Sequence, residues 1–320
     1  TSGLTFNREK WNYELKADSK DIKCGSLLQA FQNHEIKVAT ITTKDKLRFL
    51  LSRGLDGINI SSEATARFYC GNIDEIIQIS IEEAKTGKLL EGVNEEFMYS
   101  PISSFFSLDL GIALIGGKGP YIPEVLYISL SDYIPHRYEE GSEPANNFIK
   151  GIDDRIKILD EFGCNIGITA DHGMNNKYNP DGTPNSIWLK DILEGRVDNF
   201  RILLPITDKY LGHHSCLGSC AYIYFREERD IKKAYNILRR VKGIEEVLSS
   251  KEAEDEYGLA EQFTGDLFVL SDQNTVLGTT LKENSNIPIG LRSHGGLNER
   301  EVPFVLNKPL NKIIRDPLRN

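Results

Sequence analysis

Three short stretches of the sequence contain side chains suited to binding metal ions. The first is Thr169–Asn175, where Asp171 and His172 follow the apolar run Ile166–Ile168 and precede a glycine. Carboxylate and imidazole together form a ligand set that suits zinc. We interpret the apolar run as a buried parallel strand that delivers both side chains at its carboxyl end, where open α/β sheets hold their sites. Taken alone, the stretch is also compatible with a polar turn that binds no metal.

The second and third stretches each add a histidine. Asp132 and His136 are four residues apart, so one helical turn would let both face a single ion. His294 lies in Ser293–Gly296, where two glycines allow a close backbone approach and unusual dihedral angles. By itself, the first of these stretches is better explained as a solvated Asp–His pair, and the second as a turn.

Taken together, the three stretches predict a site with two metal ions. All five candidate ligands lie at or just after the end of a predicted element, and a parallel sheet brings such ends to one edge. Five nitrogen and oxygen ligands are too many for one catalytic zinc and suit two ions, which stabilise displacement at phosphorus. We therefore expect these residues to converge: Asp132, His136, Asp171, His172 and His294. The remaining histidines, His34, His213 and His214, are expected on the surface or in loops.

Strands and helices alternate in the first half of the chain, which is typical of a parallel sheet covered on both faces. Apolar and β-branched runs predict strands at 37–42, 57–60, 125–130 and 165–169. Helical spacing of apolar residues predicts helices at 25–34, 45–53, 73–85, 97–114 and 146–162. The first 23 residues are polar and are expected to be irregular.

The pattern changes after residue 176. Strands are expected at 201–206, 221–225, 245–248 and 266–270, with a helix at 231–241 and a last strand at 302–306. We predict an α/β fold whose mostly parallel sheet is sandwiched by helices, with a smaller α+β cap inserted. The core would comprise residues 1–176 and 290–320, and the cap residues 177–289.

The composition argues against several classes of protein. The net charge of the 320 residues is −9, and no Lys/Arg block suggests a nucleic-acid surface. The apolar runs are too short to span a membrane, and no signal-peptide pattern precedes them. An odd, scattered set of cysteines favours reduced thiols in a cytoplasmic protein. Cys216 and Cys220 are better explained as buried small residues than as half of a metal site.

The order of these motifs along the chain resembles that of the alkaline phosphatase superfamily. The amino acids within each motif resemble those of the phosphonoacetate hydrolase family. The similar stretches are 39–48, 131–136, 169–175, 204–208 and 292–296. The resemblance implies two zinc ions, a threonine nucleophile, and cleavage of a carbon–phosphorus bond to give acetate and phosphate. It also implies that Asp132, His136 and His294 hold one zinc, while Asp171 and His172 contribute to the other.

Lys44 and Lys46 follow the predicted strand at 37–42. Cleavage of a carbon–phosphorus bond leaves a carbanion equivalent, whose charge must spread onto the substrate carboxylate. Ammonium groups near that carboxylate would stabilise it in the transition state, and the resemblance gives lysines of this stretch that role. Without the resemblance, the two lysines are better explained as solvated side chains at the exposed start of a helix.

The sequence departs from the family at its beginning. Family members start with a strand carrying another metal-binding aspartate, followed by a helix carrying the threonine nucleophile, and neither is found. Thr42 and Thr43 end a strand but precede the lysines, so we do not assign them as nucleophile. We expect that the sequence lacks its N-terminal part, and that the chain as written binds metal incompletely and does not turn over.

Two alternatives remain open at this stage. The chain could be another superfamily member, such as a phosphodiesterase or nucleotide pyrophosphatase, or a non-catalytic remnant that binds metal or a partner. A small phosphonate is the expected partner, rather than nucleic acid or a membrane. The sequence leaves the oligomeric state open, a homodimer included.

Overall fold

The computed structural model describes residues 4–15, 24–66, 97, 99–205, 217–260, 263–283 and 287–309. The chain divides into two compact units. We call Ala17–Ile168 with Val305–Arg319 the parallel-sheet unit. We call Thr1–Lys16 with Thr169–Phe304 and Asn320 the antiparallel-sheet unit.

A three-stranded parallel sheet forms the centre of the parallel-sheet unit. Its order is β4 (Ile58–Ser61), β3 (Val38–Thr42), β5 (Val125–Ser129), with both pairings parallel. Every residue of β3 and β4 is buried, as expected for strands covered on both faces. Thr42 lies beside Ser129, so the carboxyl ends of β3 and β5 are level with each other.

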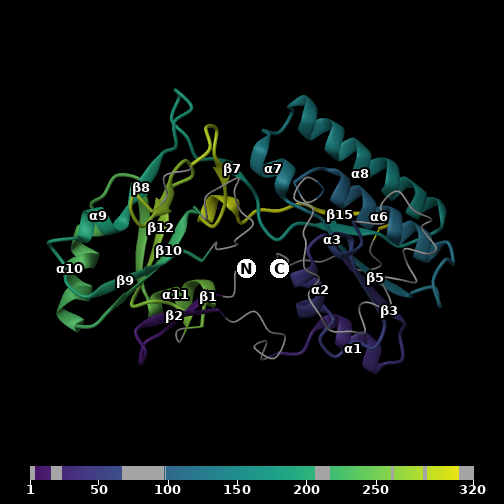
Figure 1. Ribbon diagram of the computed structural model, residues 1–320, viewed down its shortest axis with the longest axis horizontal. Helices are drawn as coiled ribbons and strands as arrows, with labels where there is room; N and C mark the ends of the chain where they lie inside the picture. The colour runs from purple at the N-terminus through teal and green to yellow at the C-terminus, as the bar shows by residue number, and fades with distance from the viewer. Residues whose placement is uncertain are drawn as a thin grey trace. The chain divides into compact units, whose positions relative to one another are not determined.

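One long helix packs on this sheet, and a second long helix packs on the first. α6 (Ile102–Ile115) is mostly apolar and lies between β5 and α8 (Glu143–Glu161) (Figure 1). Gly111 allows α6 to lie close to the sheet, because a Cβ there would come within 2.6 Å of Ile128 Cδ1. α8 is amphipathic and packs against α6, with the rings of Phe105 and Phe148 5.8 Å apart.

Shorter helices follow the strands. α1 (Leu27–Asn33) precedes β3, α2 (Asp45–Leu51) follows β3, and α3 (Ser62–Thr65) follows β4. α7 (Tyr133–Arg137) begins just after β5. α2, α3 and α7 start where the parallel strands end, so they place polar side chains at one edge of the sheet.

The strand that leads to Asp171 differs from its prediction. β6 (Gly167–Thr169) pairs with β15 (Phe304–Leu306), and all three of its residues are exposed, with Ile168 37% exposed. The expectation that this strand is buried was therefore wrong. Within the part of the chain that the structure describes, β6 has β15 as its one neighbouring strand, and β15 is itself largely exposed.

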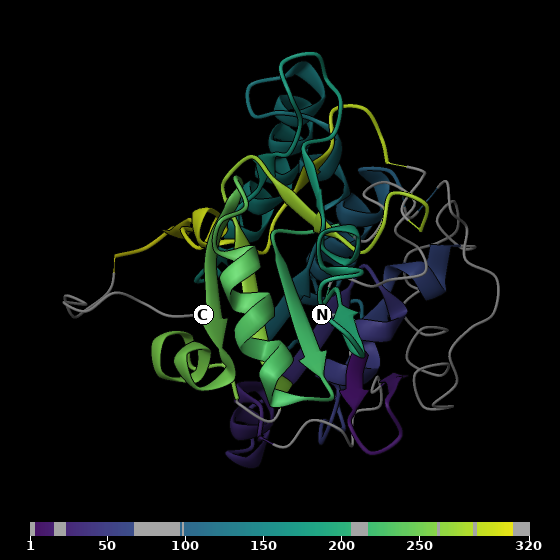
Figure 2. The same ribbon diagram turned by 90° about the vertical axis from the view of Figure 1, so that its left-hand side faces the viewer.

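The antiparallel-sheet unit is built on four strands in the order β11-β12-β10-β9. They are β9 (Phe200–Leu203), β10 (Cys220–Phe225), β11 (Ile244–Ser249) and β12 (Leu267–Ser271), and each pairing is antiparallel. Figure 2 shows α10 (Glu228–Leu238) lying across one face of this sheet. Its buried residues Ala234 and Leu238 join a core that contains Ile223 and Val247.

Smaller elements complete this unit. α11 (Ser250–Tyr257) starts with a capping box between Ser249 and Glu252. β8 (Ser186–Trp188) runs parallel to β13 (Val276–Gly278), and α9 (Leu189–Leu193) follows β8 directly.

A two-residue pairing brings together the segments that hold two predicted ligands. β7 (Asn175–Asn176) pairs antiparallel with β14 (Arg292–Ser293), and the 3₁₀ turn η4 (Leu297–Glu299) follows. β7 follows His172 in the chain, and His294 directly follows β14.

The N-terminal stretch is a β-hairpin, which corrects the expectation of irregular structure. β1 (Leu4–Asn7) pairs antiparallel with β2 (Asn12–Leu15). The Phe6 ring lies 4.4 Å from that of Tyr224 on β10, and Tyr13 donates from its hydroxyl to the Ile202 carbonyl at 2.6 Å. The hairpin is thus stabilised by contacts with residues far along the chain, which a local sequence pattern does not reveal.

Most of the long predicted elements are confirmed, with ends shifted by a few residues. The helix expected at 97–114 begins at Ile102, and the one expected at 146–162 begins at Glu143. The helix expected at 73–85 lies outside the described residues. None of the helices in the described ranges combines the length and apolar character that a membrane crossing requires. The division into a core (1–176 and 290–320) and a cap (177–289) stays a prediction.

Candidate metal and substrate site

The carboxyl edge of the parallel sheet carries two of the predicted motifs. β3 and β5 are adjacent, and the Thr43 N–H donates to the Ser129 carbonyl at 3.2 Å just beyond them. Lys44 is the N-cap of α2 and Asp132 the N-cap of α7. The lysine segment and the Asp132 motif therefore follow neighbouring strand ends within one unit.

Asp132 and His136 lie one helical turn apart. The His136 N–H donates to the Asp132 carbonyl at 3.1 Å, and His136 Nε2 lies 3.4 Å from Asp132 Oδ2. The His136 side chain is 0% exposed, whereas that of Asp132 is 37% exposed. Metal bonds of about 2.0–2.1 Å at a tetrahedral angle separate two ligand atoms by roughly 3.3 Å. The pair therefore fits two positions on a single ion.

The lysine segment is held by an acidic and a basic side chain. Asp45 Oδ1 accepts from Arg48 Nε at 2.6 Å, and both side chains are buried. The Asp45 N–H donates to Glu63 Oε2 at 2.7 Å, so α3 caps the start of α2. Thr42 Oγ1 donates to the Lys44 carbonyl at 2.9 Å. These bonds fix the backbone between Lys44 and the half-buried Lys46.

Asp171 and His172 belong to the antiparallel-sheet unit. His172 Nδ1 lies 2.9 Å from the Gly173 carbonyl. A carbonyl only accepts hydrogen bonds, so Nδ1 carries the proton of this bond, and the Nε2 lone pair is directed elsewhere. Nε2 lies 3.6 Å from Asp171 Oδ1. This hydrogen bond is compatible with the neutral tautomer that a metal bound at Nε2 requires.

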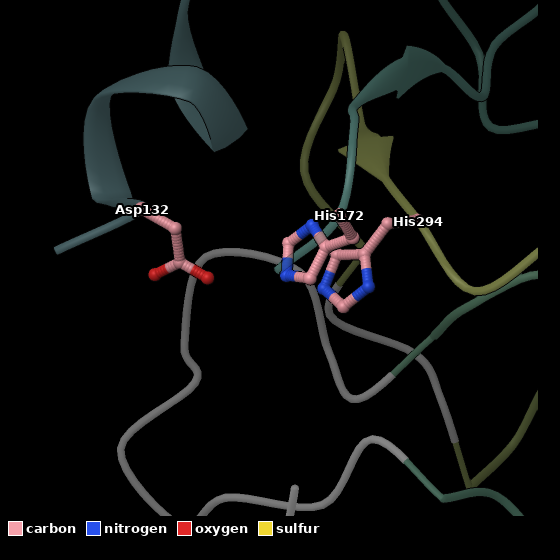
Figure 3. A group of neighbouring side chains, drawn as sticks. All are labelled: Asp132, His172 and His294. Carbon is pink, nitrogen blue, oxygen red and sulfur yellow. The ribbon is translucent and has the colours of Figure 1, made fainter. Parts of the chain in front are cut away.

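The ring of His172 stacks on that of His294. Their centroids are 3.4 Å apart and their planes differ by 9°. Figure 3 shows the two rings lying face to face. The His294 carbonyl accepts from the Ser219 N–H at 2.9 Å, and Ser293 Oγ donates to the Leu217 carbonyl at 2.6 Å. The stack and these bonds hold both imidazoles in one orientation.

Sequence reasoning missed a buried ion pair near these histidines. Lys177 Nζ donates to Glu299 Oε1 at 2.9 Å, and the two side chains are 0% and 1% exposed. Burial lowers the pKa of Lys177, and Glu299 opposes that shift. Neither residue belongs to a periodic pattern or a short motif, so no sequence signal marks them.

Each unit therefore brings together its own part of the predicted set. Lys44, Lys46, Asp132 and His136 lie in the parallel-sheet unit, and Asp171, His172 and His294 in the antiparallel-sheet unit.

The structure describes only some of the other polar candidates. His34 is exposed, while His213, His214 and Cys216 lie outside the described residues. Burial raises the pKa of the Cys220 thiol to about 12, so Cys220 is protonated at neutral pH and is a poor metal ligand.

Solved structures show what the chain is similar to. It is 32% identical to phosphonoacetate hydrolase from Sinorhizobium meliloti 1021 in complex with phosphonoformate, with a TM-score of 0.85 over 99% of this chain and 76% of that one. The complex of that enzyme with phosphonoacetate gives 32% identity and a TM-score of 0.84, over 100% of this chain and 77% of that one.

A more distant structure shares the fold alone. Murine ectonucleotide pyrophosphatase/phosphodiesterase 5 in complex with AMP is 14% identical, with a TM-score of 0.59 over 95% of this chain and 70% of that one. No family model matches the sequence.

Proposed function

The chain belongs to the phosphonoacetate hydrolase family of the alkaline phosphatase superfamily, and we propose that it hydrolyses phosphonoacetate to acetate and phosphate. The observation that carries the proposal lies within the parallel-sheet unit. A carboxylate–imidazole pair and two lysines follow the carboxyl ends of the adjacent strands β5 and β3. Such an edge suits a substrate with a phosphonate at one end and a carboxylate at the other.

Two zinc ions are part of the proposal. Asp132, His136 and His294 would hold one of them, as the family resemblance implies. Asp171 and His172 would contribute to the other. The donor spacing of Asp132 and His136 and the tautomer of His172 support this assignment. When bound, zinc supplies Lewis-acid stabilisation of the negative charge that develops on phosphonate oxygens.

Lys44 and Lys46 would bind the substrate carboxylate. The reaction breaks the carbon–phosphorus bond, phosphorus gains an oxygen from water, and the methylene carbon gains a proton to give acetate. Negative charge on that carbon delocalises onto the carboxylate as the bond breaks. Two ammonium groups at the carboxylate stabilise this charge in the transition state. The buried Asp45–Arg48 pair holds the start of α2, from which both lysines extend.

A comparison of two substrates tests the proposal. The natural protein, loaded with zinc, is expected to release acetate and phosphate in equal amounts from phosphonoacetate. Treatment with a chelator is expected to stop this reaction. Hydrolysis of bis(p-nitrophenyl) phosphate is expected to be much slower. Rapid cleavage of the diester without turnover of phosphonoacetate would instead identify a phosphodiesterase.

A further inference from the structure

The segments that carry His172 and His294 are joined by a very short sheet. β7 and β14 pair through two residues each, with Ser293 opposite Asn175. So short a pairing is only marginally stable and holds a backbone weakly. Further contacts must keep the stacked rings in place, and they converge on Glu299.

Glu299 forms hydrogen bonds with both histidine-bearing segments. Its carbonyl accepts from the Gly173 N–H at 2.7 Å, and Gly173 is the residue that follows His172. Its Oε2 accepts from the Gly296 N–H at 2.8 Å, two residues after His294. One buried residue therefore ties together the backbones next to both imidazoles.

The carboxylate of Glu299 makes further contacts through its other oxygen. Oε1 accepts from Asn175 Nδ2 at 2.7 Å and from Lys177 Nζ at 2.9 Å, and Lys177 Nζ also donates to the Gln273 carbonyl at 2.6 Å. A buried carboxylate without a counter-ion costs several kcal/mol, and Lys177 compensates that cost. Hydrogen bonds to an ionised carboxylate are roughly twice as strong as neutral ones. The ionised carboxylate thus strengthens its own bonds to the Gly296 N–H and to Asn175, while the bond from the Gly173 N–H goes to the Glu299 backbone carbonyl.

Glycines allow Glu299 to approach this closely. A Cβ at Gly173 would lie 3.4 Å from Glu299 Cα and 3.3 Å from the Glu301 carbonyl oxygen. A Cβ at Gly296 would lie 3.2 Å from Glu299 Oε2 and 3.0 Å from Ser219 Cβ. Most of these distances are at or below the lower limit of ordinary contacts, and the neighbours of Gly173 are backbone atoms that cannot easily move.

We propose that Glu299, with Lys177 as its counter-ion, is a positioning residue that fixes the imidazoles of His172 and His294 for binding zinc. The inference rests on the proposed function, because it gives a role to groups that act through the backbone of the zinc ligands. A role limited to stability would lower the free energy of unfolding without changing the affinity for metal.

Glu299→Gln separates the two roles, because glutamine keeps the shape of the side chain and removes its charge. Asp266→Asn is the matched control in the same unit: Asp266 accepts from Arg8 at 2.8 and 3.1 Å and from the Phe225 N–H at 2.8 Å. Zinc affinity is measured by competition with a chromophoric chelator, alongside urea unfolding of the metal-free proteins. Loss of a group that orients the metal ligands without binding the metal typically weakens metal binding by about 10–100-fold. We expect Glu299→Gln to weaken zinc binding at least about tenfold. Asp266→Asn should lower stability and leave zinc affinity unchanged.

A second measurement does not depend on the metal. In the metal-free protein with ¹⁵N-labelled histidine, Glu299→Gln should shift the imidazole signals of His172 and His294 and leave that of His34 unchanged. Unaltered signals and unaltered zinc affinity would overturn the positioning role while leaving the proposed function intact. A wild-type protein that binds no zinc would overturn both proposals.

A third variant covers the case in which Glu299→Gln does not fold. Asn175→Ala removes one bond to the carboxylate and keeps the Lys177–Glu299 ion pair. We expect it to weaken zinc binding in the same direction, though less than Glu299→Gln. Full zinc affinity in a folded Asn175→Ala protein would contradict the inference.

Discussion

The imidazole rings of His172 and His294 stack face to face, with centroids 3.4 Å apart and planes 9° from parallel. The two residues are far apart in the sequence. His172 precedes β7 and His294 follows β14, and these two strands pair with each other. Neither ring can rotate without losing contact with the other. The stack therefore presents two potential zinc ligands as one rigid pair.

Removal of either ring should reduce the zinc that the protein retains. We expect His294→Ala and His172→Ala each to lose at least one zinc equivalent after dialysis, because two or fewer protein ligands hold zinc weakly. The metal content is measured by mass spectrometry of the purified proteins. His34→Ala is the control, since His34 is exposed at the end of α1. Retention of all the zinc by His294→Ala would remove that residue from the ligand set.

Lys46→Ala should affect substrates selectively. We expect turnover of phosphonoacetate to fall by about 10²–10³, the usual loss for one electrostatic contact to a developing charge. Hydrolysis of an activated aryl phosphate should fall far less, because its leaving group stabilises its own charge. Lys157→Ala, at an exposed position on α8, should change neither rate. Equal losses on the two substrates would show that Lys46 does not bind the carboxylate.

The Asp45–Arg48 pair should contribute strongly to stability. Asp45→Asn leaves the Arg48 guanidinium buried without its carboxylate, and breaking such a pair costs about 3–5 kcal/mol. Urea unfolding measures the change in the free energy of unfolding. Glu161→Gln removes an exposed ion pair with Lys157 on α8 and should cost less than about 1 kcal/mol. Similar costs for the two variants would mean that the Asp45–Arg48 pair is not buried.

Cys220 should make stability sensitive to alkali. Burial raises the pKa of its thiol from 9.0 to about 12, so the folded protein keeps a proton that the unfolded chain loses above about pH 9. The contribution to stability is therefore complete below about pH 9 and is lost as the pH rises towards 12. The loss should reach about 1.4 kcal/mol per pH unit in that window.

The measurement is urea unfolding at pH 8 and pH 10.5 for the wild type and Cys220→Ala. Comparing how the free energy of unfolding changes with pH in the two proteins isolates the effect of the thiol. It removes the effects of other titrating groups, among them the tyrosines of the same sheet. At pH 8.5, iodoacetamide should label the exposed Cys24 and leave Cys220 unlabelled. Rapid alkylation of Cys220 in the folded protein would show that its thiolate is accessible.

The local sequence pattern was sufficient to predict the strands with continuous apolar runs and the helices with clear helical spacing of apolar residues. The runs at 37–42 and 125–130 became β3 and β5, and the amphipathic spacing after Asn146 became α8. The four-residue spacing of Asp132 and His136 predicted their shared helical turn. In each case neighbouring residues in the sequence determine the outcome, because hydrogen bonds and side-chain faces repeat over a few residues.

Tertiary contacts decided the rest. β6 has an apolar sequence but is exposed, since burial depends on which strands lie beside it. The hairpin of β1 and β2 looks irregular in sequence and is stabilised by Tyr224 and Ile202, far along the chain. The pairing of Lys177 with Glu299 is also invisible in the sequence, because an ion pair between distant residues depends on chain folding and has no period. The residue types and spacings therefore indicate which chemistry is available. Only the folded backbone determines which other groups hold the reactive side chains in place.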